Sequence, residues 1–407
     1  MPELDLPADT NGVLPSQLLR QAIDRGIVHA GDEPVPHDNV QPASIDLRLG
    51  DVAYRMRCSF LPGEELVEDG YKPFVIDELD LRDAGAVLET NRPYLIPLHE
   101  QLRLPPGIRA KANPKSSTGR LDVFCRVITD HSHLFDEVEP GYEGRLWLEV
   151  VPLSFTVRVR QGLSLNQLRL SVGRSEVGDD ELRALHGAQP LLFDQNGAVP
   201  EARFAADDGL FLGLDLRGDD AGRVGWRARG HTRLLDMSRV DSYWPVDFWE
   251  PVEREAGDRV VLDPGTFYLL LSEQRVCVPP DLAAEMTAFD PTSGELRVHY
   301  AGFFDPGFGF DPDRPVQGSR AALEVRAHDV PFMIEHGQRV CRLRFERMAE
   351  IPDRLYGQQI GSAYQGQLDT LSKHFRRIPP APSQRRPDGD DSQLDLGLPE
   401  TPARRRF

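Results

Sequence analysis

A stretch that occurs twice decides the fold of this chain: residues 94–106 are YLIPLHEQLRLPP, and residues 268–280 are YLLLSEQRVCVPP. Further matched pairs follow the same order along the chain, at offsets of 166 to 175 residues. They are 45–50 with 214–218, 118–123 with 293–298, 139–142 with 305–308, and 148–150 with 323–325. Because chance similarity does not preserve order over such a distance, the sequence predicts two tandem copies of one domain.

Both copies have the pattern of short strands. Residues 43–49, 145–150 and 155–159 alternate apolar and polar positions, which is typical of half-buried strands. The chain also contains 35 Gly and 34 Pro among its 407 residues, which suits a fold with many turns. We therefore expect an all-β fold with a few short helices, in which each copy forms a sandwich or a barrel.

The predicted boundaries follow from this repeat and from a change in composition near the C-terminus. We expect the first copy at residues 1–175, the second at 176–350 and a C-terminal lid segment at 351–376. Residues 377–407 are rich in Pro, Arg, Asp and Ser and contain few large apolar side chains. Such a segment cannot bury enough surface to offset its ordering entropy, so we predict a disordered tail. Helical spacing of apolar residues predicts one short helix within 14–27.

Composition excludes several classes of protein. The net charge of −18 argues against a broad nucleic-acid-binding surface, and the chain has only four lysines, Lys72, Lys111, Lys115 and Lys373. No apolar run reaches the roughly 18 residues that a membrane span requires, and the N-terminus does not resemble a signal peptide. The four cysteines show no CxxC spacing, so no zinc site is expected. We expect a cytoplasmic protein with no membrane or nucleic-acid partner.

Two segments are candidates for chemistry. Residues 111–120, KANPKSSTGR, combine cations, hydroxyls and a glycine, a mixture that can bind phosphate, although the composition taken alone favours a polar turn between strands. Residues 139–149, EPGYEGRLWLE, read as a turn followed by a strand that places Trp147 and Glu149 on one face. A carboxylate beside an aromatic ring can act as a general base, whereas an isolated Glu on a strand is usually a solvated surface residue.

Taken together and in this order, these segments resemble the dCTP deaminases of the dUTPase-like superfamily, in their tandem-duplicated long form. The matching segments are 41–50 (QPASIDLRLG), 115–120 (KSSTGR), 139–144 (EPGYEG) running into Leu148 and Glu149, 161–167 (QGLSLNQ) and 361–367 (GSAYQGQ). The resemblance implies that each copy is a dUTPase-like distorted β-barrel or jelly roll. It also implies hydrolysis of dCTP to dUTP and ammonia, a step toward dTTP.

The resemblance further implies roles for single residues. Glu149 matches the glutamate that activates water without a metal, and Ser116 and Arg120 match residues that hold the water and the transition state. Nucleotide-binding positions are Lys115, Ser117, Gly119, Glu139, Tyr142, Trp147, Leu148, Tyr356 and Gln367. No protein metal ligand and no zinc are expected, because the zinc-deaminase signature is missing. Mg²⁺ is expected only as an ion bound to the phosphate oxygens of the nucleotide.

Some positions depart from the family pattern. The family usually has Asp where Glu139 stands and Trp or Phe where Tyr142 stands, and the lid lysine position is Ala363. In the second copy, residues 290–295 are DPTSGE instead of KSSTGR, and the added acidic groups would repel a triphosphate. We therefore expect a degenerate second copy in which Glu324 is structural.

Alternatives to a plain deaminase stay open from the sequence. A bifunctional dCTP deaminase and dUTP diphosphatase would release dUMP and pyrophosphate. A catalytically silent nucleotide-binding regulatory protein would bind dCTP without turnover. The resemblance also suggests dTTP as a feedback inhibitor and a homo-oligomer, predicted as a trimer in which three chains supply six copies.

Overall fold

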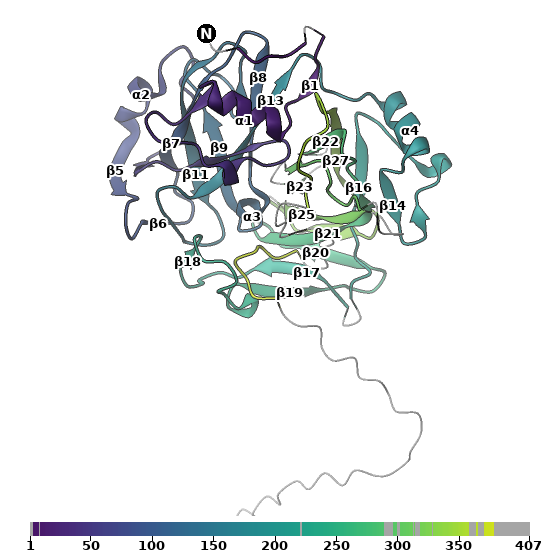
Figure 1. The fold of residues 1–407 in the computed structure, drawn as a ribbon. Coiled ribbons are helices and arrows are strands. Elements are labelled where there is room, and N and C mark those ends of the chain that lie inside the picture. The colour runs from purple at the N-terminus through teal and green to yellow at the C-terminus, as the bar shows by residue number, and fades with distance from the viewer. Residues whose placement is uncertain are drawn as a thin grey trace, which may run out of the picture. The chain divides into compact units, whose positions relative to one another are not determined.

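The structure is a computed structural model of the chain. It describes residues 3–7, 9–219, 222–288, 296–298, 302–311, 313, 318–327, 329–357, 364 and 370–377. Strands are the commonest regular elements of the described chain, and its helices are few and short (Figure 1). The prediction of an all-β fold with a few short helices is therefore confirmed. The predicted tail, apart from Arg377, lies outside the described residues.

The N-terminal half, up to residue 175, contains two main sheets. The first consists of β1 (Gly12–Val13), β13 (Ser164–Val172), β8 (Ile108–Pro114), β10 (Glu137–Val138) and, against β13, β3 (Ile45–Arg48). The second consists of β5 (Val75–Asp80), β4 (Val52–Met56), β7 (Tyr94–Arg103), β11 (Glu143–Pro152), β9 (Val123–Ile128) and, against β7, β2 (Val28–His29). A smaller sheet joins β6 (Ala86–Leu88), β12 (Val157–Val159) and, from the other half, β18 (Leu235–Asp236).

The C-terminal half, residues 176–377, is built in a similar way. One sheet consists of β15 (Gly197–Ala198), β14 (Leu192–Asp194), β21 (Phe267–Val276), β17 (Arg223–Ala228), β19 (Trp249–Glu253), β25 (Ser319–Ala327) and β23 (Leu296–Val298). A second consists of β16 (Leu210–Gly213), β27 (Arg339–Arg347), β22 (Leu282–Ala288) and β24 (Phe303–Phe304). A third pairs β20 (Arg259–Leu262) with β26 (Phe332–Glu335).

Helices are confined to short connections. They are α1 (Ser16–Asp24), α2 (Val67–Gly70), α3 (Ser116–Gly119) and α4 (Asp179–Ala188), with 3-10 turns at His37–Asn39, Lys72–Phe74, Glu201–Arg203 and Pro245–Asp247. α1 forms within the predicted stretch because its apolar residues repeat at helical spacing, and Leu18, Leu19 and Ala22 are buried. None of the helices in the described part of the chain is both long and apolar enough to cross a membrane.

Strand pairing is closely similar in the two halves. The order β7–β11–β9 corresponds to β21–β25–β23, and the pair β8–β13 corresponds to β22–β27. Even the register agrees, because Glu149 on β11 faces Leu95 on β7, and Glu324 on β25 faces Leu269 on β21. The two glutamates therefore occupy equivalent places in two similar sheets.

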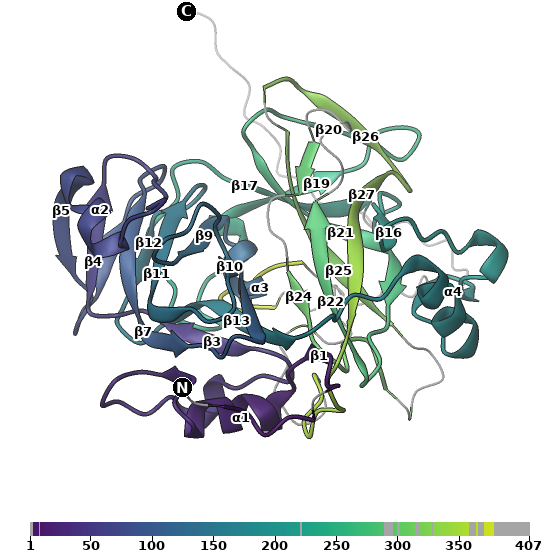
Figure 2. The same cartoon turned by 90° about the horizontal axis from the view of Figure 1, so that it is seen from above.

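The hydrophobic cores show how the halves meet. The core of the N-terminal half also includes side chains from the other half, among them Leu235, Trp249, Phe267, Leu269 and Phe375. A separate cluster fills the C-terminal half and contains Tyr268 and Val325. Neighbouring residues on a strand point to opposite faces, so β21 and β25 turn one face to each core. Figures 1 and 2 place α3 between the two halves.

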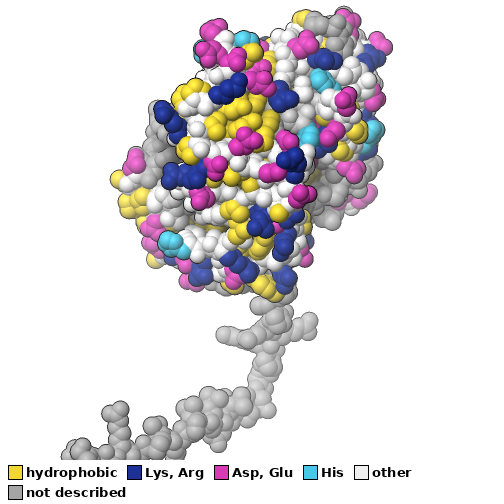
Figure 3. Space-filling view, turned by 90° about the vertical axis from the view of Figure 1, so that its left-hand side faces the viewer, with side chains coloured by type: hydrophobic (Ala, Val, Ile, Leu, Met, Phe, Trp, Pro, Cys, Tyr) yellow, Lys and Arg dark blue, Asp and Glu magenta, His cyan; other side chains and the backbone are white. Residues whose placement is uncertain are grey.

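The surface on the side of α2 and β5 mixes apolar and charged side chains (Figure 3). Leu66, Ile76 and Leu134 are exposed large hydrophobic residues of the neighbouring segments. Basic and acidic side chains are interspersed around the apolar area in this view (Figure 3). Such a mixed surface does not present a large field of one sign.

Candidate active site

The segment KSSTGR forms a single helical turn between β8 and β9. The Gly119 amide donates to the Lys115 carbonyl at 3.0 Å, and the Arg120 amide donates to the Ser116 carbonyl at 3.2 Å. This turn brings the side chains of Ser116 and Arg120 together, and Arg120 Nε donates to Ser116 Oγ at 3.1 Å. Arg120 is only 3% exposed, so its charge lies inside the protein next to a hydroxyl.

The C-terminal segment packs against this turn. Arg120 Nη1 donates to the Thr370 carbonyl at 3.1 Å, and the guanidinium lies 3.8 Å from the ring centre of Tyr364. Ser372 Oγ donates to the Ser117 carbonyl at 2.9 Å. A cation above an aromatic face and a buried hydrogen bond both fix position, so the C-terminal segment orients the motif.

A group of cations lies at the start of the turn. The Lys115 ammonium pairs with the Asp46 carboxylate on β3. Burial lowers the pKa of Lys373, and the neighbouring charge of Lys115 lowers it further. Two lysines from distant parts of the sequence therefore share this place, which suits an anion with several negative charges. The predicted gap at Ala363 lies outside the described residues.

The carboxylate next to Arg120 comes from the other half. A methyl group placed on Gly119 would lie 2.8 Å from both carboxylate oxygens of Glu324. Burial raises the pKa of Glu324 to about 8, while the charge of Arg120 lowers it and that of Asp122 raises it. Among the described residues no hydrogen-bond partner of this carboxylate is found. A buried carboxyl group without a fixed partner and with a pKa near neutrality is suited to proton transfer.

The turn of the C-terminal half that precedes β25 also faces this region. Asp305 is buried and accepts a hydrogen bond from Arg169 at 3.4 Å. Burial raises the pKa of Asp305 to about 6. The charge of Arg169 lowers this pKa, and the charge of Asp46 raises it. The ring of Tyr356 lies 5.8 Å from that of Phe308, and its amide donates to the Pro306 carbonyl at 2.9 Å. The predicted lid residue Tyr356 therefore contacts the turn of the second half.

Glu149 is placed elsewhere. Its cross-strand neighbour on β9 is Arg126, and Arg126 Nε donates to Glu149 Oε1 at 3.1 Å. The Arg126 guanidinium stacks on Phe135, and Trp147 packs against Tyr71 with ring centres 5.3 Å apart. Among the described residues, the ion-pair partner of Glu149 is thus Arg126 and not Arg120. Of the predicted group Ser116, Arg120 and Glu149, the structure brings the first two together, while Glu149 lies with Arg126. The carboxylate in the field of Arg120 is that of Glu324.

The other predicted binding residues of the first half lie in the turn before β11, on β11 itself, or in the core. Glu139 is exposed in its turn, and the Tyr142 hydroxyl donates to the Arg145 carbonyl at 2.6 Å. Burial raises the pKa of Tyr142. Trp147 and Leu148 are 2% and 0% exposed, so both are core residues. Gln367 lies outside the described residues.

The sequence did contain a signal for the residues that were missed. The resemblance expects Asp and Trp or Phe at the turn, where the first half has Glu139 and Tyr142. The second half has Asp305 and Phe308 at these positions. The better match to the family turn is thus in the half whose KSSTGR motif is lost.

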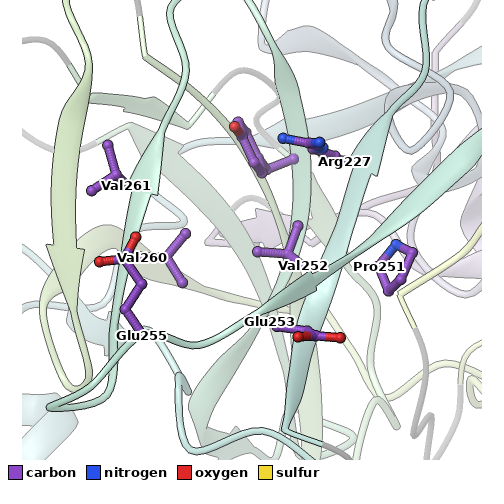
Figure 4. Close-up of a pocket in the computed structure, with 8 residues that line it drawn as sticks. Arg227, Pro251, Val252, Glu253, Glu255, Val260 and Val261 are labelled. Carbon is purple, nitrogen blue, oxygen red and sulfur yellow. The ribbon is translucent and has the colours of Figure 1, made fainter.

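A hollow in the C-terminal half lies apart from this cluster (Figure 4). It is lined by Arg227, Pro251, Val252, Glu253, Glu255, Val260, Val261 and Tyr268. Tyr268 is paired with Val325, and Glu324 is paired with Leu269, so Tyr268 and Glu324 point to opposite faces of the sheet. The described residues also contain no group of three or more His, Cys, Asp or Glu that could hold a metal ion.

Comparison with known proteins finds matches to both halves of the chain. The family model of the 2'-deoxycytidine 5'-triphosphate deaminase (DCD) N-terminal domain matches residues 10–174, and that of the C-terminal domain matches residues 178–375. A crystal structure of 2'-deoxycytidine 5'-triphosphate deaminase from Agrobacterium tumefaciens is 45% identical, with a TM-score of 0.79. The match covers 86% of this chain and 100% of that one.

Curated relatives match shorter parts of the chain. The dUMP-forming dCTP deaminase of Mycolicibacterium gilvum is 30% identical over 179 residues, 42% of this chain and 86% of that protein. The dCTP deaminase of Metallosphaera sedula is 32% identical over 132 residues, 32% of this chain and 68% of that protein. The dUMP-forming dCTP deaminase of Halobacterium salinarum is 36% identical over 126 residues, 30% of this chain and 60% of that protein. The chain therefore belongs to the dCTP deaminase family.

Proposed function

We propose that this protein is a dCTP deaminase that hydrolyses dCTP to dUTP and ammonia. The observation that carries the proposal is the buried carboxyl group of Glu324, which lies against Gly119 and in the field of Arg120. The names of the relatives and of the similar solved structure support the same substrate. The activity requires a base for water, a group that stabilises charge and a site for a triphosphate, and this cluster offers all three.

In this mechanism Glu324 takes the place that the sequence suggested for Glu149. Its carboxylate removes a proton from water, the resulting hydroxide attacks C4 of cytosine, and the same group delivers the proton to the departing amine. Ser116 accepts the hydrogen bond of Arg120 Nε, which leaves its own hydroxyl hydrogen available to a bound water or base. Arg120, always charged, stabilises negative charge that develops in the transition state.

The remaining parts of the nucleotide have partners around the same turn. Lys115 and Lys373 would neutralise the triphosphate, and Mg²⁺ would arrive on the phosphate oxygens without a protein cage. Asp305, Phe308 and Tyr356 would lie beside the deoxyribose, the part that the resemblance gave to Glu139 and Tyr142. Residues 1–175, 176–350 and 351–376 are in this proposal two tandem copies and a lid segment.

The two copies divide one site between them. The first supplies Ser116 and Arg120, and the second supplies Glu324 and Asp305. A homotrimer, a cytoplasmic location and feedback inhibition by dTTP complete the proposal. Sedimentation of the full chain would test the trimer, and adding dTTP to the assay would test inhibition.

A product assay tests the main proposal directly. The full chain is incubated with dCTP and Mg²⁺, and dUTP and ammonia are measured over time. Stoichiometric release of both is expected, and CTP serves as the control substrate because the family acts on deoxynucleotides. Tight dCTP binding in calorimetry without any product would instead identify a silent binding protein.

A bifunctional enzyme is the second candidate, because several relatives are named as dUMP-forming. Such an enzyme would hydrolyse dUTP further to dUMP and pyrophosphate. Pyrophosphate that appears in step with ammonia would identify it. Accumulation of dUTP without pyrophosphate would show that the protein is a deaminase that does not hydrolyse dUTP further.

A further inference from the structure

A buried ion pair crosses between the halves close to the proposed catalytic groups. Asp122 follows Arg120 by two residues, and Arg326 follows Glu324 by two residues. Arg326 Nη2 donates to Asp122 Oδ2, and the two side chains are 15% and 0% exposed. One ion pair thus links the strand that carries the carboxylate to the segment that carries the arginine.

The pair lies on the same face of β25 as Glu324. Glu324 faces Leu269 and Arg326 faces Phe267 across the strand pair, and both partners belong to the core of the N-terminal half. Val325, between them, points to the other core. A shift of Arg326 along or away from Asp122 would therefore move the Glu324 carboxylate with it.

Both members of the pair are held by further hydrogen bonds. Ser154 Oγ donates to Asp122 Oδ2 at 2.5 Å, and the Asp122 amide donates to the Gly119 carbonyl at 2.8 Å. On the other side, Arg326 Nη1 donates to the Gly265 carbonyl. Because each end is anchored in its own half, the pair fixes the distance between the halves at this point.

We propose that Asp122 and Arg326 are positioning residues, which hold the Glu324 carboxylate against Gly119 and Arg120. The proposal rests on the function proposed above, in which Glu324 is the base and Arg120 stabilises charge. A displacement of about 1 Å at a reacting group can lower a rate roughly a hundredfold, so such a link affects catalysis without touching substrate. The negative charge of Asp122 also raises the pKa of Glu324.

Kinetics of single variants in the full chain test the proposal. We expect Asp122→Asn and Arg326→Met to lower kcat at least about tenfold and to leave the KM for dCTP within about threefold, because the triphosphate site is not altered. Arg326→Lys, which keeps the charge, should recover part of the loss. In Asp122→Asn the acid limb of the pH profile should move to lower pH, because a negative neighbour of Glu324 is removed.

A second ion pair between the halves provides the control. Arg160 Nη2 lies 3.0 Å from Asp236 Oδ2, and Asp236 is buried, but neither residue touches the cluster around Arg120. Arg160→Met should lose stability and keep kcat. If Asp122→Asn and Arg326→Met have the same kcat as Arg160→Met, the pair is merely structural and the proposal is overturned.

A measurement that does not depend on turnover separates this proposal from the proposed function. The titration of Glu324 is obtained from the pH dependence of the free energy of unfolding, as the difference between wild type and Glu324→Gln. Asp122→Asn must lower the midpoint of this difference. An unchanged midpoint contradicts the link between Asp122 and Glu324, whereas absence of dCTP turnover in the wild type contradicts only the proposed function.

Discussion

β11 and β25 occupy equivalent places in the two halves, yet their central glutamates have opposite surroundings. Glu149 on β11 is paired with Arg126. Trp147, two residues before Glu149 on the same strand, packs against Tyr71. Glu324 on β25 has Ala322 at the place of Trp147 and lies against Gly119 of the other half. The first carboxylate is ion-paired inside its own sheet, and the second lies against a turn of the other half.

This difference shows that equivalent positions of two similar strands can place a carboxylate in very different surroundings. The charge of Glu149 is balanced by the ion pair with Arg126. A buried carboxyl group whose pKa is raised can give and take a proton near neutral pH. In this protein the half without the KSSTGR segment holds the second kind.

The largest difference is expected when each of the two carboxylates is removed in turn. Glu324→Gln should lower kcat for dCTP deamination by roughly a thousandfold or more, because the base is removed. Glu149→Gln should leave kcat within a few-fold of wild type and mainly affect stability, since its role is to pair with Arg126. Ammonia release measures both, and full activity in Glu324→Gln would refute the assignment.

We expect kcat/KM for dCTP to change by about two orders of magnitude with pH. Deamination needs Glu324 ionised, and its pKa is raised to about 8 by burial. The value of kcat/KM should therefore rise about tenfold per pH unit below 8 and level off above it. The profile of dCTP turnover between pH 6 and 9, an interval of about 2 units on the acid side, checks this.

The same titration affects stability with a defined sign. Because the folded-state pKa of Glu324 is raised, its contribution to stability is fully present below the ordinary pKa of a glutamate and is lost as pH rises through about 8. Urea unfolding at several pH values should show this loss in wild type. The corresponding slope should be smaller in Glu324→Gln, and equal slopes would contradict a raised pKa.

A smaller effect is expected from a single methyl group between the halves. Gly119→Ala places a carbon 2.8 Å from the Glu324 oxygens, so the carboxylate must move away. We expect kcat to fall by roughly 10- to 50-fold. Gly107→Ala is the matched control, because nothing lies within 4 Å of a side chain there. A similar kcat in both variants would show that Glu324 need not lie against the turn.

The smallest effect concerns the triphosphate. Lys373→Met removes one of two clustered cations, so the KM for dCTP should rise by about 3- to 10-fold while kcat changes little. Lys72→Met, at an exposed position outside the site, should leave both constants unchanged. A KM for Lys373→Met equal to that of Lys72→Met would remove Lys373 from the site.

Much of this could be predicted from the sequence. Alternating strands and the repeated YLIPLHEQLRLPP pattern predicted the β fold, since strand periodicity is local. Ser116 and Arg120 stand four positions apart, so a single helical turn brings them together. The turn with Asp305 and Phe308 also matches the family turn better than the turn with Glu139, but its half lacks the KSSTGR segment.

The type of each element, the two sets of strands and the available chemical groups follow from the sequence alone. Which glutamate lies in the field of Arg120 follows only from the tertiary structure. Glu149 and Glu324 stand at equivalent positions of similar strands, so local pattern cannot distinguish them. The choice follows from the packing of β25 against α3 of the other half, where Gly119 leaves room for a carboxylate and Arg126 has no part. Contacts between distant segments depend on how whole sheets pack, and short-range sequence patterns do not encode that packing.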